Sequence, residues 1–173
     1  MEKGGAMKDP QVRSELVRAG HAAVFGWLAT SVMTLLMALC LIPGAPDALR
    51  PFPVEFVRHV FPRLSPLALT LVTVPLHFGY GAAAGALFAF LARPMTLGRG
   101  FAFGFALWIV MQILFVPIGY GWLEFGLGGG HPWPALVSLV LHLCYGGMLG
   151  WLGGRDDLSH HTQFDEADRL RVA

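Results

Sequence analysis

Two histidines that lie within long apolar segments have the clearest potential for chemistry in this sequence. Each is followed by two glycines at four-residue spacing, which places the three residues on one face of a helix. The two sets are His77, Gly81 and Gly85, and His142, Gly146 and Gly150. Imidazoles at similar depth on two helices could provide both axial ligands of a haem, with room for the macrocycle beside the glycines. The chain has no Cys-x-x-Cys-His motif, so this haem would be of the non-covalent b type.

The same histidines have a simpler interpretation, in which each forms a hydrogen bond to a neighbouring helix. A polar group inside a membrane needs a partner, because leaving it unpaired costs free energy. The candidate partners are Tyr80, Tyr145, Gln112, Thr30, Ser31 and Thr34. On this interpretation, which we favour, no cofactor is predicted. The glycines then serve helix packing, together with Gly100 and Gly104 on another apolar segment.

Other chemistry has little support in the sequence. It contains no nucleophile elbow, phosphate loop, dinucleotide fingerprint or His-Glu-x-x-His zinc motif, so no catalytic residues are predicted. The adjacent His160 and His161 are a poor metal site without further ligands, so no metal site is predicted either. A small transporter or channel is a further alternative, although an ion path would normally include a membrane-buried carboxylate and the apolar segments contain none.

Four apolar segments must position these residues. They cover residues 20–42, 67–91, 100–119 and 134–153, and none contains Asp, Glu, Lys or Arg. About 18 such residues are enough to cross the hydrocarbon core of a bilayer as a helix. Charged residues make up only 13% of the chain, against about a quarter in soluble proteins. We therefore predict an all-α membrane protein with four transmembrane helices in an up-down bundle over residues 20–153, with the lipid bilayer as a partner.

Charge in the flanking segments predicts the orientation of this bundle. Lys and Arg occur in residues 1–19, at Arg93 and Arg99, and in the polar tail 154–173, and by the positive-inside rule these parts are cytoplasmic. The bias is not clean, because the first outer connection also carries Arg50, Arg58 and Arg63, whereas the third connection has no Lys or Arg. The first outer connection contains a possible amphipathic interfacial helix at residues 53–62. The tail is too polar to bury a core, so we expect it to be disordered. A net charge of +1 without a basic patch argues against nucleic-acid binding.

The second and fourth apolar segments resemble each other, which indicates an internal repeat. At an offset of 65 residues, Leu76, His77, Tyr80, Gly81, Gly85 and Leu87 match Leu141, His142, Tyr145, Gly146, Gly150 and Leu152. The first and third segments match more faintly at an offset of 78, which aligns Gly26 with Gly104. Each half has two helices, so both halves enter the membrane in the same sense. The predicted repeat is therefore parallel, unlike the inverted repeats of many transporters.

A series of residues in the second half of the chain is similar to a known family. The series is Gly104, Trp108, Gln112, Pro117, Gly119, Pro132, Trp133, Ser138 and His142. In this order it resembles the second half of YagU-like bacterial inner-membrane proteins, a family without a settled biochemical role. The resemblance implies a small multi-pass protein of a bacterial inner membrane. With the glycine-lined faces, it leads us to predict a non-enzymatic protein that acts as a self-associating bundle or as an accessory subunit of a membrane complex.

Overall fold

The structure is a computed structural model that describes residues 10–40, 52–115 and 133–172, and every regular element in these ranges is a helix. The elements are α1 (Pro10–Cys40), α2 (Phe52–Val60), α3 (Pro66–Leu91), α4 (Leu97–Val110), the π-helical η2 (Met111–Phe115) and α6 (Trp133–Val172). Four apolar stretches, in α1, in α3, in α4 with η2, and in α6, are long enough to cross a membrane. The predictions of an all-helical chain with four membrane-spanning lengths are confirmed. Residues 116–119 of the third predicted span lie outside the described residues.

Two helices extend further than the sequence analysis predicts. α1 begins at Pro10 rather than near residue 20, and its first turns carry Glu15 and Arg18, which contact other parts of the chain. α6 continues to Val172, whereas a disordered tail is expected from residue 154. Residues 155–173 contain neither Gly nor Pro, so the sequence has no signal that ends the helix. α2 is the helix expected at residues 53–62, and its Val57 is buried.

Side-chain caps fix where α3 and α4 begin. The Ser65 hydroxyl accepts a hydrogen bond from the Ala68 amide, and the Thr96 hydroxyl accepts one from the Arg99 amide, both at 3.3 Å. Such caps satisfy amide groups that have no partner within the first helical turn. The connection 92–96 between α3 and α4 is short, which favours an antiparallel arrangement of the two helices.

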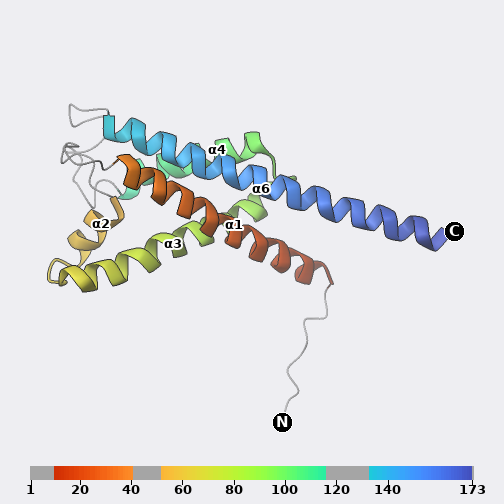
Figure 1. Ribbon diagram of the computed structural model, residues 1–173, viewed down its shortest axis with the longest axis horizontal. Coiled ribbons are helices and arrows are strands. Elements are labelled where there is room, and N and C mark those ends of the chain that lie inside the picture. The colour runs from red at the N-terminus through yellow and green to blue at the C-terminus, as the bar shows by residue number, and fades with distance from the viewer. Residues whose placement is uncertain (1–9, 41–51, 116–132, 173) are drawn as a thin grey trace, which may run out of the picture.

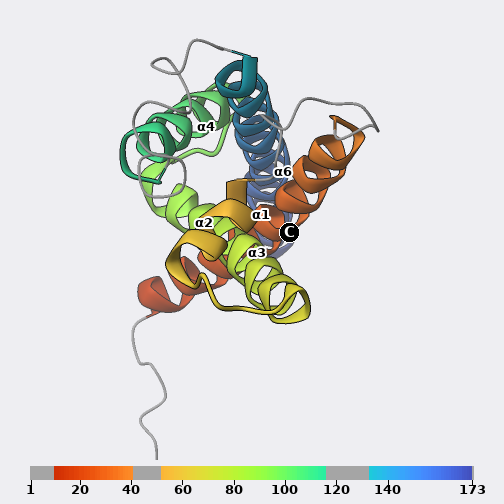
Figure 2. The same cartoon turned by 90° about the vertical axis from the view of Figure 1, so that its left-hand side faces the viewer.

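The four long helices pack in the order α3, α1, α6 and α4. The most extensive contacts join α1 to α3, α4 to α6 and α1 to α6, and Figure 2 shows α6 between α4 and α1. α3 and α4 also touch through Phe88 and Phe103, whose ring centroids are 5.1 Å apart. Successive long helices run in opposite directions (Figure 1), so the bundle has an up-down form. The beginning of α1, the α3–α4 connection and the projecting end of α6 lie at one end, and α2 lies at the other.

Small side chains dominate the buried centre of the bundle, while large apolar side chains face outward. The central cluster consists of Ala22, Ala29, Ala84, Phe88, Ala89, Ala92, Met95, Tyr145 and Leu149. Outward side chains include Leu67 and Leu91, which are about 70% exposed (71% and 69%). An apolar outer surface of this kind suits contact with lipid tails, and a small-residue centre lets helix backbones approach closely.

Glycines bring the helices of each pair into direct contact. A Cβ atom added at Gly26 would come closer than 3.0 Å to the backbone of α3 at Gly81, and one added at Gly85 would meet the backbone of α1 at Ala22 and Gly26. In the other pair, a Cβ atom at Gly100, Gly104, Gly146 or Gly150 would meet the backbone of the facing helix in the same way. The two crossings therefore depend on glycine at these positions.

The two crossings match each other in a different register from the one that the sequence alignment predicts. Gly26 opposes Gly81 and Gly85 as Gly100, not Gly104, opposes Gly146 and Gly150. The counterpart of Gly104 in the first pair is Thr30, whose side chain lies against Gly81. The alignment of Gly26 with Gly104 is thus one helical turn away from the match in contacts, because identity between two glycine-rich helices does not fix where each helix crosses its neighbour.

The glycine contacts lead to a paired test of stability. Gly146→Ala places a methyl group against the backbone of α4. We expect it to lower the free energy of unfolding in detergent by about 1–3 kcal/mol, the usual cost of overpacking. Gly79→Ala on the outward side of α3 is the matched control, because a Cβ atom there has no neighbour within 4 Å. Equal stability of the two variants in a denaturant titration would contradict the close crossing.

Candidate functional site

His77 is half-buried on α3 and faces α1. Its Nε2 atom lies 3.1 Å from Oγ1 of Thr34. The Thr34 hydroxyl donates its one hydrogen to the carbonyl of Thr30 at 2.7 Å, so it accepts a hydrogen bond from Nε2 of His77. The nitrogen that lies farther from the backbone, and is thus the more accessible ligand, is already used in a contact between two helices.

His142 is deeply buried on α6, with 5% of its surface exposed. Its Nδ1 atom lies 2.7 Å from the carbonyl oxygen of Ser138 on the same helix. A carbonyl can only accept, so Nδ1 carries the hydrogen and donates it. The backbone carbonyl of His142 itself lies against Gly104 of α4. His142 thus belongs to the α4–α6 crossing, whereas His77 belongs to the α1–α3 pair.

The other polar residues singled out in the sequence differ in burial and in hydrogen bonding. Tyr145 is 4% exposed and its hydroxyl donates to the carbonyl oxygen of Gly81 at 2.6 Å, which joins α6 to α3. Tyr80 is 43% exposed, so the two tyrosines of the predicted repeat differ in burial. Gln112 lies in η2, and its buried Nε2 atom has no hydrogen-bond partner among the residues that the structure describes. The buried hydroxyl of Thr73 on α3 also has none within these residues.

The surroundings of the two histidines do not fit a haem. Each predicted glycine face is filled by a neighbouring helix: Gly81 by Thr30 and Gly26, and Gly146 by Gly100 and Gly104. The ring of Tyr145 crosses from α6 to α3 one turn along from His142 and reaches Gly81. A macrocycle needs an open slot between the two ligand-bearing helices, and here Tyr145 bridges α6 and α3 across that space.

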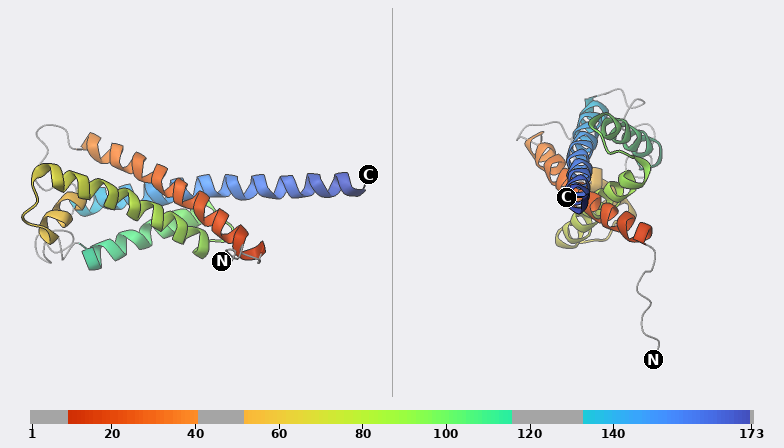
Figure 3. Two further views of the ribbon diagram at one scale, coloured as in Figure 1. Left: turned by 90° about the horizontal axis from the view of Figure 1, so that it is seen from below. Right: turned by 90° about the vertical axis from the view of Figure 1, so that its right-hand side faces the viewer.

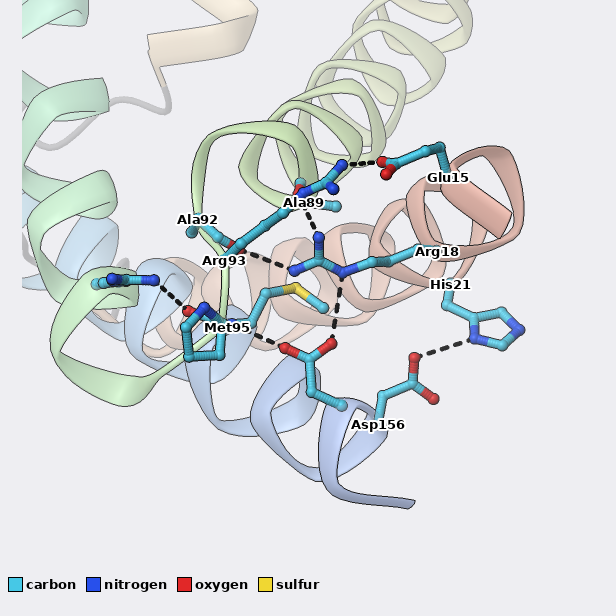
Figure 4. Close-up of polar contacts among 11 residues, drawn as sticks. Glu15, Arg18, His21, Ala89, Ala92, Arg93, Met95 and Asp156 are labelled. Carbon is cyan, nitrogen blue, oxygen red and sulfur yellow. Dashed lines mark hydrogen bonds and ion pairs between the residues drawn. The ribbon is translucent and has the colours of Figure 1, made fainter. Parts of the chain in front are cut away.

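At the end of the bundle with the α3–α4 connection, Arg18 links three parts of the chain (Figure 4). Its Nη1 and Nη2 atoms donate to the carbonyl oxygens of Ala89 and Ala92 at 3.0 and 2.9 Å. Its Nε atom lies 3.4 Å from Oδ1 of Asp157 on α6. The final carbonyls of a helix have no partner within it and favour a positive charge nearby. Arg18 therefore caps the C-terminal end of α3 while it pairs with α6.

Further polar contacts complete what we call the Arg18 cluster (Glu15, Arg18, Arg93 and Asp157). Oδ2 of Asp157 accepts a hydrogen bond from the Met95 amide at 2.8 Å, and Arg93 forms an ion pair with Glu15. These contacts connect α1, the α3–α4 connection and α6. The sequence analysis missed the cluster, because its partners are more than sixty residues apart in the chain. The sequence did contain one signal for the cluster, namely opposite charges beside the ends of predicted spans that lie on the same side of the membrane.

The Arg18 cluster does not resemble a metal centre or a catalytic site. Within residues 10–40, 52–115 and 133–172, no group of three or more His, Cys, Asp or Glu side chains could hold a metal ion. The contacts of Arg18 are with backbone carbonyls and one carboxylate that is itself bound to an amide. Such an arrangement fixes the relative positions of helices at the edge of the membrane-spanning segments.

For Arg18, we expect Arg18→Lys to lower the free energy of unfolding by about 1–3 kcal/mol, the usual cost of leaving buried polar groups unpaired. An ammonium group keeps the charge but cannot reach two carbonyls and a carboxylate in the planar geometry of a guanidinium. Arg13→Lys, at an exposed position on the same helix, is the control and should change stability by less than about 0.5 kcal/mol. The role given to Arg18 is wrong if thermal or detergent unfolding does not separate these two variants.

For the histidines, we expect the protein purified from haem-supplemented cells to show no Soret absorption, because Tyr145 bridges α3 and α6 and His77 is bound to Thr34 of α1. The matched experiment adds haem to the purified chain and to a His77→Ala, His142→Ala double variant. Both should give the spectrum of unbound haem. A Soret band that only the unsubstituted chain acquires, in a one-to-one ratio, would overturn the conclusion that the site does not fit.

Comparison with known proteins provides no further guide to this site. No protein-family model matches the sequence, and neither curated proteins nor solved structures give a significant match. The interpretation of the molecule therefore depends on its own geometry.

Proposed function

We propose that this chain is a small, non-enzymatic, multi-pass protein of a bacterial inner membrane that works by association, either with a second copy of itself or as an accessory subunit of a membrane complex. The observation that carries the proposal is the projecting end of α6. The candidate span in this helix ends at Asp157, yet the helix runs on to Val172. In Figures 1 and 3 this end extends beyond every other helix.

A projecting helix needs a reason for its stability. Residues 158–172 would extend roughly 20 Å from the bundle at 1.5 Å per residue. An isolated helix of this length is only marginally stable in water, because the cost of nucleation is offset by few hydrogen bonds. Continuity with the membrane segment removes the nucleation cost, and packing against another polypeptide supplies the remaining stabilisation. This supports a role in which α6 contacts a partner.

The contacts inside the bundle support a structural rather than an enzymatic role. The polar side chains of Thr30, Thr34, His77, His142 and Tyr145 form hydrogen bonds to helix backbones or to one another. The glycines of the two crossings contact helices of the same chain, so they are not available to a second copy. A partner must therefore use another surface, and we assign that contact to the projecting end of α6.

The distribution of charge supports cytoplasmic ends for α1 and α6. Five arginines lie toward the end of the bundle from which α6 projects (Figure 1). They are Arg13 and Arg18 early in α1, Arg93 and Arg99 at the α3–α4 connection and the start of α4, and Arg155 in α6. By the positive-inside rule that end faces the cytoplasm. The resemblance of the second half to YagU-like proteins supports a bacterial inner membrane, and the match between the two glycine crossings supports a parallel two-helix repeat.

The proposal predicts that the full chain is not an isolated monomer in mild detergent. Light scattering coupled to size-exclusion chromatography should give a protein mass of at least two copies, or of one copy with a stoichiometric partner. A chain that ends at Asp157 should run as a monomer, because it lacks the projecting helix.

The truncated chain is also the control for folding. Its helical circular dichroism per residue and its unfolding midpoint should stay close to those of the full chain, because the Arg18 cluster and both glycine crossings lie before residue 158. A full chain that is strictly monomeric and brings no partner with it would refute the proposal. The same holds if truncation leaves the assembly unchanged.

A further inference from the structure

A pocket of about 850 Å³ lies beside the Arg18 cluster, between the α3–α4 connection and α6. This volume falls within the roughly 300–1,000 Å³ of typical ligand sites. Apolar groups of Met95, Leu97 and Trp151 form much of its wall, and Arg93 and Arg155 contribute positive charge. The lining thus combines an apolar surface with cations, which is the complement of an amphipathic anion.

The cations of this pocket are not all neutralised by the protein. Arg18 and Asp157 also line the pocket, but they pair with each other, so their charges cancel. Arg93 pairs with Glu15, which is not part of the lining. The guanidinium of Arg155 lies 4.3 Å from the centroid of the Trp151 ring, and within the described residues it contacts no carboxylate. The pocket therefore keeps a net positive charge with Arg155 as its least compensated cation.

The pocket also lies at the ends of the candidate spans, and the ends of a transmembrane helix are where lipid headgroups meet it. Its lining comes from the ends of candidate spans: the α3 span ends at Leu91, the α4 span begins at Leu97, and the α6 span ends at Asp157. Trp151 is half-exposed, in the position that tryptophan favours at a membrane boundary. A basic pocket between transmembrane helices at this level, on the cytoplasmic side, suits the phosphate group of an anionic lipid.

We propose that this pocket binds the headgroup of an anionic glycerophospholipid. Arg155 and Arg93 contact the phosphate, Trp151 and Leu97 contact the first part of the acyl chains, and Arg18 holds the α3–α4 connection in place as one wall. The inference goes beyond the proposed function, because binding of a lipid requires neither a second copy nor a partner protein.

The test measures how a trace of fluorescently labelled phosphatidylglycerol binds to the full chain in micelles of a neutral detergent. Unlabelled phosphatidylglycerol should compete at least tenfold better than phosphatidylcholine, whose headgroup has no net charge. Inorganic phosphate should not compete, since it lacks acyl chains. Equal competition by phosphatidylcholine would overturn the proposal, and competition by inorganic phosphate would assign the pocket to a soluble anion instead.

Variants separate the pocket from general attraction between a basic protein and an acidic lipid. A direct hydrogen bond to a charged phosphate is worth about tenfold or more in affinity, so Arg155→Gln should weaken binding about tenfold and the Arg93→Gln, Arg155→Gln double variant still further. Arg13→Gln removes the same charge from an exposed site on α1 outside the pocket, and it should change binding less than twofold. An equal effect of Arg13→Gln and Arg155→Gln would overturn the proposal. Circular dichroism and elution volume confirm that each variant is folded.

Discussion

The direct contact of helix backbones at glycine is the constraint on which the rest of this bundle depends. In lipid, apolar side chains gain little by leaving the bilayer for one another, so helices associate through close packing and hydrogen bonds. Gly26 with Gly81 and Gly85, and Gly100 with Gly146 and Gly150, supply that close packing in the two pairs. Where the helices touch in this way, no room remains between them for a cofactor or a second chain.

This constraint decides the role of the buried polar groups. Once α1 and α3 are in contact, Thr34 comes within reach of His77. Where the two helix pairs meet, Tyr145 of α6 comes within reach of the Gly81 carbonyl of α3. Each bond satisfies a group that would be costly to leave unpaired in the membrane. The matching His-Tyr-Gly patterns of the two halves thus have different surroundings, because Tyr145 is buried where the pairs meet while Tyr80 is 43% exposed.

The sequence predicts the spans well and the polar contacts poorly, for a physical reason. Hydropathy depends on composition along the chain, so α3 (Pro66–Leu91) lies within one residue of its predicted range 67–91. Charge ends a membrane span but does not end a helix, which explains why α1 starts before its apolar segment and α6 continues after Asp157. The partner of His77 depends on the crossing of two helices, and Arg18 meets Ala89 only after the chain has folded back. Neither is encoded in a local pattern.

The polar contacts also determine the register in which the helices cross, which the glycines alone do not fix. Glycines at four-residue spacing, such as Gly146 and Gly150, permit close approach in more than one register, because a slide of one helical turn again brings a glycine to the crossing. Arg18 does not have this freedom, because its three nitrogen contacts must meet two specific carbonyls and one carboxylate at once. The glycines therefore set how closely the helices approach, and the Arg18 cluster, with the Tyr145 bond to Gly81, selects one register among those that the glycines allow.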